Sequence, residues 1–150
     1  MPQSLSFLLV HIIFSAKDRA PMLGATIRPA LHAYLATVSS NAGCECYRAG
    51  GVADHVHLAI RLSRTITVAS LVETLKRSSS KWLKAQSPDL AKFSWQGGYG
   101  AFSVGPAYLD DLRRYIDDQE EHHRLHTFQD EYRNFLAKYG IEYEEGYVWD

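Results

Sequence analysis

The chain has 150 residues, of which 46% are hydrophobic and 22% are charged, and its net charge is −1. This composition is typical of one globular domain with an ordinary core. It excludes a membrane span, because no apolar run approaches the roughly 20 residues required. We also expect no secretory signal. Two cysteines, Cys44 and Cys46, are too few for a disulfide framework, so we expect a cytoplasmic protein.

Charge is segregated along the chain. Residues 61–92 carry a balance of +5, whereas residues 110–150 carry a balance of −7. A basic segment of this kind is often only a solvated helix face, but it also suits a nucleic-acid backbone. The net charge of −1 is therefore the sum of a basic central segment and an acidic C-terminal segment.

The first half of the chain predicts the order strand, helix, strand, strand. Residues 6–14 are nearly continuous in apolar side chains, which indicates a central strand. Helical spacing of apolar residues follows over residues 26–40. A short strand at residues 44–49 precedes an apolar, β-branched strand at residues 56–62. Gly50 and Gly51 are the predicted turn between them.

The second half predicts a helix, a strand and two further helices. Thr65 or Thr67 can cap the first helix, which Pro88 ends. A last strand is expected at residues 99–104. A helix then continues to about Arg124, and a shorter helix begins with a cap at Thr127.

This order predicts an α+β fold. It matches a ferredoxin-like split βαβ antiparallel sheet with helices on one face and a C-terminal helical extension. We expect the core to span residues 1–105 and the extension residues 106–140. Residues 141–150 form an acidic, aromatic tail.

His55 and His57 are one residue apart in a predicted strand, so both side chains project from the same face. Neutral imidazoles are good ligands for divalent metals. Such a pair alone is more often structural than metal-binding. Asp54 could orient a ligand imidazole, provided that it lies in the turn before the strand.

Tyr115 and Gln119 are four residues apart on a predicted helix, hence neighbours on one helix face. If that face covers the histidine strand, Gln119 can offer a carbonyl oxygen as third metal ligand. Tyr115 would then lie beside the metal. Two imidazoles and an amide oxygen with open positions favour Mg²⁺ or Mn²⁺ over a structural zinc.

These motifs resemble a known superfamily. His55-Val56-His57 resembles the His-hydrophobe-His motif of the HUH endonucleases, and residues 115–123 resemble the nucleophile helix of their single-tyrosine transposases. Those enzymes move bacterial insertion sequences as single-stranded DNA, and they have relatives at repetitive extragenic palindromes. The similarity covers essentially the whole chain, including residues 10–15, 75–82, 95–103 and 142–150.

The resemblance implies a mechanism. Tyr115 would be the catalytic nucleophile, attacking a phosphodiester in single-stranded DNA and leaving a 5′-phosphotyrosine. A Mg²⁺ or Mn²⁺ ion on His55, His57 and Gln119 would act as Lewis acid. The resemblance also implies imperfect DNA hairpins as partners and a homodimer that can exchange its tyrosine helix, near residues 97–100 or 105–106.

Six residues are candidates for DNA binding. Four basic side chains could meet backbone phosphates, and two aromatic ones could stack on unpaired bases. They are Lys76, Arg77, Lys81, Lys84, Trp95 and Tyr99. Trp82 lies on an apolar stripe and is expected in the core.

Two other function classes remain open at this point. A domesticated or non-mobile nucleic-acid-binding protein of the same fold would need no metal ligands. A metal-dependent hydrolase of small phosphoesters would not need a basic middle. Three further histidines, His122, His123 and His126, are expected on the surface or at a dimer contact, although one could approach the active site.

Overall fold

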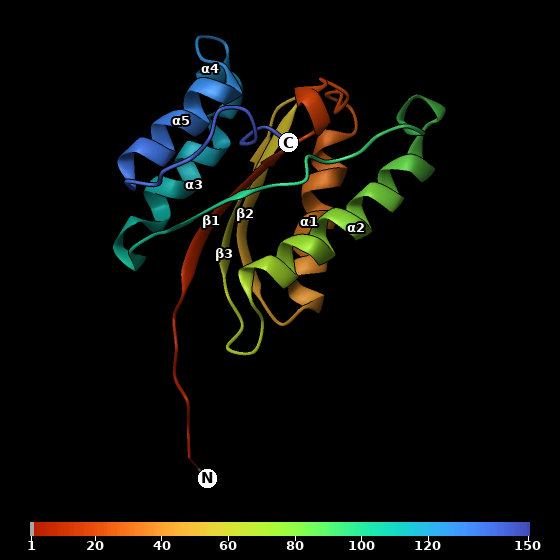
Figure 1. The fold of residues 1–150 in the computed structure, drawn as a ribbon. Coiled ribbons are helices and arrows are strands. Elements are labelled where there is room, and N and C mark those ends of the chain that lie inside the picture. Colours follow the sequence, from red (N-terminus) through yellow and green to blue (C-terminus); the bar gives the residue numbers. More distant parts are fainter. Residues whose placement is uncertain (1) are drawn as a thin grey trace.

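The computed structural model describes residues 2–150 and contains a four-stranded antiparallel sheet with the strand order β2-β3-β1-β4 (Figure 1). The strands are β1 (Leu9–Ser15), β2 (Glu45–Gly51), β3 (His55–Arg61) and β4 (Gly100–Ser103). The helices are α1 (Arg28–Asn41), α2 (Val68–Gln86), α3 (Leu109–Asp117), α4 (Gln119–His123) and α5 (Phe128–Lys138). This order and pairing confirm the predicted ferredoxin-like fold.

Helices α1 and α2 cover one face of the sheet with an apolar core. Alternate residues of β1 and β3 point into it, and all are fully buried: Ile12, Phe14, Val56, Leu58 and Ile60. Leucines from both helices complete this core. Burial of each such side chain contributes about 1.5–3 kcal/mol to folding.

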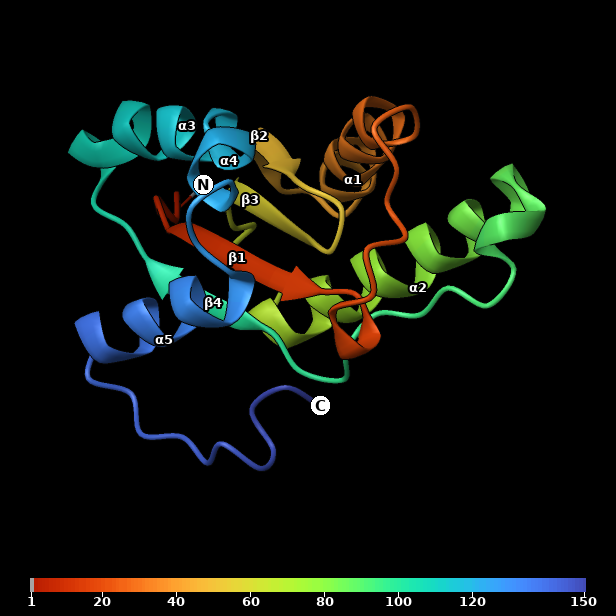
Figure 2. The ribbon, with the colours of Figure 1, turned by 90° about the horizontal axis from the view of Figure 1, so that it is seen from above.

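The other face of the sheet is covered by α3, α4 and α5, so helices lie on both faces (Figure 1). The core helices α1 and α2 lie on one face, as expected, and the C-terminal helical extension covers the other. Seen from above, α3 and α4 lie beside β2 and β3, whereas α5 lies beside β4 (Figure 2). The odd-numbered residues of β1 and β3 face this second layer, and they include the histidine pair.

Two glycines allow the extension helices to approach the sheet closely. A Cβ at Gly50 would lie 2.6 Å from Cγ2 of Ile116 on α3, and a Cβ at Gly100 would lie 2.6 Å from Cε2 of Tyr132 on α5. The prediction that Gly50 and Gly51 form the turn is wrong, because β2 continues through Gly51. The chain turns at residues 52–54 instead. Gly50 serves close packing of α3 rather than chain reversal.

The predicted helix up to Arg124 is interrupted. Helix α3 ends at Asp117 and α4 begins at Gln119, with Asp118 outside helical geometry between them. The carbonyl of Tyr115 accepts a hydrogen bond from the side-chain Nε2 of Gln119 at 3.3 Å. Asp is a poor residue within helices because its side chain competes for backbone groups. Of the two caps predicted for α2, Thr67 is the one that forms, since its hydroxyl accepts from the backbone N–H of Ser70. The predicted cap at Thr127 is confirmed by the hydrogen bond that it accepts from the backbone N–H of Asp130.

The acidic tail returns to the core. The backbone N–H of Gly98 donates to the carbonyl of Asp150 at 2.9 Å, and Arg133 pairs with Glu145 at 2.7 Å. Within residues 2–150, no helix is both long and apolar enough to cross a membrane.

Candidate active site

His55 and His57 lie at the centre of the sheet and are completely buried beneath the extension helices. Their ring centroids are 5.0 Å apart. The Nδ1 atom of His57 contacts Nε2 of His11 at 2.8 Å, so the two rings share one proton between these nitrogens. The Nε2 atoms of His55 and His57 both face α4 and α5. The i, i+2 spacing therefore directs two imidazole nitrogens at one point.

Asp54 lies in the turn before β3, which is the position that allows it to orient a ligand imidazole. Nδ1 of His55 donates a hydrogen bond to Oδ1 of Asp54 at 2.7 Å. This contact fixes the ring orientation and leaves Nε2 directed toward the interior of the site. Asp54 therefore positions one of the two candidate ligands.

Tyr115 and Gln119 come together with the histidine pair. Oε1 of Gln119 lies 3.1 Å from Nε2 of His55, and Gln119 is buried. The ring of Tyr115 lies 5.7 Å from the ring of His57, measured between centroids. The tyrosine thus lies at the histidine pair of its own chain.

Glu131 is the residue that the sequence reasoning missed, and it occupies the middle of the cluster. The residue as a whole is 3% exposed. One oxygen, Oε1, lies 3.1 Å from Nε2 of His57 and 3.4 Å from Nε2 of His55. The other, Oε2, accepts hydrogen bonds from the Tyr115 hydroxyl and from Nε2 of Gln119. Glu131 therefore connects the nucleophile candidate to the histidine pair.

A signal for Glu131 is present in the sequence. Phe128, Tyr132 and Leu136 form the buried stripe of α5, and Glu131 lies within that stripe. A carboxylate is almost never fully buried unless it is paired. An acidic residue on the apolar face of a predicted helix is thus the pattern that would have identified it.

The three histidines in and after α4 differ in their distance from the cluster. His123 enters the cluster, with Nε2 at 3.1 Å from Oε1 of Glu131 and Nδ1 at 2.8 Å from the carbonyl of His126. His122 lies at the margin, its Nε2 being 3.2 Å from Oε2 of Glu131 without hydrogen-bond geometry. Of the three histidines, His123 is the one that approaches the active site most closely.

The electrostatics of the cluster follow from burial and pairing. Burial alone would raise the pKa of Glu131, but hydrogen bonds from His123, His55 and His57 outweigh it and hold the pKa well below its usual range. Burial would lower the pKa of His55, yet Asp54 and Glu131 raise it to about 9. Burial lowers the pKa of His57 to about 4. Glu131 is therefore a carboxylate surrounded by hydrogen-bond donors.

Tyr115 is held as a neutral phenol. Burial and the charge of the neighbouring Glu131 raise the pKa of its hydroxyl well above the ordinary value. A phenol in this state is a weak nucleophile. The site therefore needs an added positive charge, or a rearrangement around Glu131, before Tyr115 can react.

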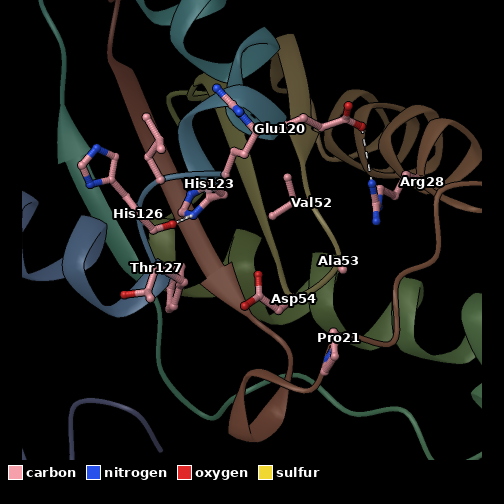
Figure 3. A pocket seen from close by; sticks show the side chains of 12 residues that line it. Pro21, Arg28, Val52, Ala53, Asp54, Glu120, His123, His126 and Thr127 are labelled. Carbon is pink, nitrogen blue, oxygen red and sulfur yellow. Dashed lines mark hydrogen bonds and ion pairs between the residues drawn. The ribbon is translucent and has the colours of Figure 1, made fainter.

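Two cavities flank the cluster. One, of about 620 Å³, is open to solvent and has Asp54 and His123 on its wall, with Arg28 of α1 across from them (Figure 3). Arg28 pairs with Glu120 at 3.4 Å. The second cavity, of about 710 Å³, reaches Tyr115 from the other side and is bordered by Tyr108, Tyr139 and Lys138. Of these two cavities, only the second is lined by Tyr115.

The predicted DNA-binding residues lie on α2 and on the segment before β4, away from the cluster. Lys81 and Lys84 are exposed. Arg77 is exposed and pairs with Glu73 on its own helix. Tyr99 is 36% exposed, which leaves part of its ring free. These four residues remain compatible with DNA contact.

Two of the predicted DNA-binding residues, Lys76 and Trp95, make structural contacts within the protein. Nζ of Lys76 donates to the carbonyls of Gln96 and Gly98, at 2.8 and 2.6 Å, and so ties the glycine-rich loop to α2. Trp95 is only 8% exposed, and its indole donates to Ser79 at 2.9 Å. The prediction that Trp95 stacks on bases is thus wrong, because its faces pack against protein.

The ferredoxin-like core, the histidine pair and the adjacent tyrosine helix define a tyrosine transposase of the HUH superfamily. The family model described as "Transposase IS200 like" matches residues 4–119, so the chain belongs to the IS200-like transposase family. No curated protein matches the chain.

Two solved structures share the fold. One is described as a putative transposase from Deinococcus radiodurans R1, with a TM-score of 0.61 and 20% sequence identity; the match covers 79% of this chain and 98% of that one. The other is a REP-associated tyrosine transposase bound to a REP hairpin, with a TM-score of 0.52 and 14% identity, covering 78% of this chain and 69% of that one. At these identities the similarity establishes the fold.

Proposed function

We propose that this protein is a single-strand DNA endonuclease and strand transferase that cuts and rejoins DNA at hairpin-marked ends through Tyr115. The observation that carries the proposal is the contact chain in one protomer. The Tyr115 hydroxyl bonds to Glu131, and Glu131 bonds to both His55 and His57. A candidate nucleophile, a carboxylate that can accept its proton and two imidazoles suited to metal binding therefore lie in one cluster.

The donor set fits a divalent metal ion. Imidazole nitrogens of His55 and His57 and the amide oxygen of Gln119 converge, and Oε1 of Glu131 lies among them. A buried carboxylate facing several imidazoles is an arrangement that a cation would stabilise. We assign His55, His57 and Gln119 to Mg²⁺ or Mn²⁺. When bound, the ion would polarise the scissile phosphate and stabilise the departing 3′-oxygen.

The bond changes involve groups of the chain and of the DNA, together with one proton from solvent. The Tyr115 oxygen forms a bond to phosphorus, the bond from phosphorus to the 3′-oxygen breaks, and that oxygen takes a proton from solvent. The phenolic proton passes to Oε2 of Glu131, to which it is already hydrogen-bonded. Because the tyrosyl ester keeps the energy of the phosphodiester, another 3′-hydroxyl can displace Tyr115 and rejoin DNA.

The surroundings suit a single strand. Tyr108 and Tyr139 border the cavity beside Tyr115 and offer partly exposed rings for stacking, and Lys138 adds a cation. The basic residues Lys81 and Lys84 on α2 are available for a hairpin stem. A hairpin complex of a protein with the same fold supports this class of partner.

Catalysis within one chain is the arrangement we favour, because Tyr115 already lies at its own histidine pair. The predicted homodimer stays a prediction. Light scattering of the protein with and without hairpin DNA would test it. Mixing a Tyr115→Phe chain with a His57→Ala chain would restore cleavage only if tyrosine helices are exchanged.

The decisive experiment is incubation with single-stranded hairpin DNA and Mn²⁺, followed by a denaturing gel. We expect a covalent protein–DNA adduct that disappears in Tyr115→Phe. A non-cleaving binder would retard the hairpin without forming an adduct, and a small-phosphoester hydrolase would do neither. Undiminished cleavage by Tyr115→Phe would contradict the assignment of the nucleophile.

A further inference from the structure

The larger of the two cavities that Tyr115 lines has the size of a ligand site. Its volume is about 710 Å³, and it is enclosed by residues from the end of β4, from α3 and from the end of α5. Pockets for small ligands usually measure about 300–1,000 Å³. The other cavity, beside His122 and Asn134, has a volume of only about 190 Å³. Of these two cavities, only the larger has room for a nucleotide.

Two tyrosine rings in the lining are exposed to solvent but fixed by local contacts. Tyr108 is 63% exposed, and a Cβ at Gly105 would lie 3.2 Å from its Cδ2, so this ring lies close against the backbone. Tyr139 is 38% exposed, and its hydroxyl donates to the carbonyl of Ser103 at 2.8 Å. Its ring centroid is 5.0 Å from that of Phe102. Exposed rings of this kind are surfaces on which unpaired bases stack.

The charged side chains of the cavity suit a single phosphate group. Lys138 borders both cavities that Tyr115 lines, and its Nζ lies 5.9 Å from the centre of the Tyr139 ring. Asp111, the acidic residue of the lining, pairs with Arg114 on its own helix. Because that carboxylate already has a cationic partner, the Lys138 ammonium group can serve a phosphate.

We propose that this cavity holds the nucleotide directly 3′ of the cut, with its base stacked on Tyr108 and its 5′-phosphate beside Lys138. The inference rests on the proposed function, in which Tyr115 becomes joined to the 5′-phosphate of that nucleotide. The nucleotide must therefore stay next to Tyr115, and the cavity of about 620 Å³ beside Asp54 is not lined by Tyr115. Because every base has a face that can stack, the subsite requires a base but accepts any of the four.

The first test detects the base by fluorescence and does not require cleavage. Hairpin DNA carries 2-aminopurine, whose emission falls on stacking, at one single-stranded position at a time. The full-length Tyr115→Phe protein binds this DNA and leaves it uncut. We expect emission to fall at the nucleotide directly 3′ of the cut that the wild-type protein makes.

Substitutions of Tyr108 in the same Tyr115→Phe protein identify the stacking ring. Tyr108→Ala should abolish the loss of emission, whereas Tyr108→Phe, which keeps the ring, should retain it. Tyr147→Ala is the matched control, because it removes a tyrosine that is 72% exposed on the tail and lies outside the cavity lining. This control should behave as the parent protein does.

The second test measures the rate of adduct formation in a single turnover with Mn²⁺. Loss of the base 3′ of the cut and Tyr108→Ala should each slow the reaction about tenfold, since both remove one stacking contact. Combined, they should slow it no more than either does alone. Loss of the base 5′ of the cut is the DNA control and should act independently of Tyr108. Lys138→Gln should also cost about tenfold, and Lys138→Arg should restore most of the rate.

Circular dichroism establishes that each variant is folded. Loss of emission that persists in Tyr108→Ala would overturn the subsite, as would two rate losses that multiply. An unchanged rate in Lys138→Gln would overturn the position of the phosphate. If the wild-type protein forms no adduct while one probe position still loses emission only when Tyr108 or its Phe variant is present, the proposed function fails and the base subsite stands.

Discussion

The two faces of one sheet have opposite chemistry. Leu58 and His57 are neighbours on β3, both without solvent exposure, yet Leu58 packs among leucines of α1 and α2, whereas His57 contacts His11 and Glu131. One layer is an apolar core. The other is a network of buried imidazoles and a carboxylate between the sheet and the extension helices.

The difference shows how the fold separates stability from chemistry. Apolar packing on the first face does not depend on the protonation of any group. On the second face each polar group requires a partner, because a buried charge without one is costly. The extension helices provide those partners, so α3 to α5 complete the site as well as cover the sheet.

The largest expected effect is on the polar face. In His57→Ala, we expect DNA cleavage to fall by roughly 10³-fold or more, as when one member of a catalytic set is removed. Retardation of hairpin DNA in a native gel should persist, because the exposed lysines of α2 are unchanged. Cleavage at the wild-type rate would remove His57 from the site.

The adjacent residue provides the matched change on the apolar face. Leu58→Ala should lower the free energy of unfolding by about 2–5 kcal/mol, through lost burial and a residual cavity. Chemical denaturation measures this loss. The folded fraction should retain DNA cleavage, and a variant as inactive as His57→Ala would show that the two faces are not independent.

Gly50→Ala examines the contact between β2 and α3. The new methyl group would meet Cγ2 of Ile116 at 2.6 Å and the backbone carbonyl of Ile116 at 3.1 Å, so α3 must shift. We expect a destabilisation of about 1–3 kcal/mol together with weaker cleavage, since Tyr115 lies on the same helix. Gly24→Ala, where nothing lies within 4 Å of the new Cβ, is the control. Full activity in Gly50→Ala would mean that α3 tolerates displacement.

The smallest expected effect is on the pH dependence of stability, and it concerns a histidine on α1, on the apolar side of the sheet. Unlike His55, which has two carboxylate partners, His32 on α1 is partly buried near Arg28, and burial lowers its pKa to about 4. Because the unfolded chain binds the proton more readily, stability falls as pH drops from about 6.5 to about 4. In His32→Gln, denaturation curves across this range should show a weaker pH dependence. An unchanged dependence would mean that other groups dominate it.

Much of the fold could be predicted from the sequence. Apolar spacing located every strand and every long helix, and the caps at Thr67 and Thr127 were correct because capping is a local interaction. Gly50 and Gly51 were misplaced because a glycine pair has the same local signature in a turn and at a close helix contact. The break at Asp118 was missed because no glycine or proline marks it in the sequence.

The candidate site was predictable only in part. The pairs His55–His57 and Tyr115–Gln119 follow from local strand and helix periods, which place their side chains together whatever the rest of the chain does. Trp95 was misassigned because exposure depends on the partner surface. The contacts of Lys76 were not foreseen, because the carbonyls to which it donates are twenty or more residues away in the chain.

The sequence by itself determined the ferredoxin-like core, the histidine pair and the tyrosine helix, since each arises from short-range spacing. Only the tertiary structure decided that α5 returns across the sheet and brings Glu131 between the histidines and Tyr115. The position of α5 on the sheet depends on contacts between residues far apart in the chain. Phe128, Tyr132 and Leu136 are buried there against Phe102 and Ile13. That packing carries a carboxylate into the site.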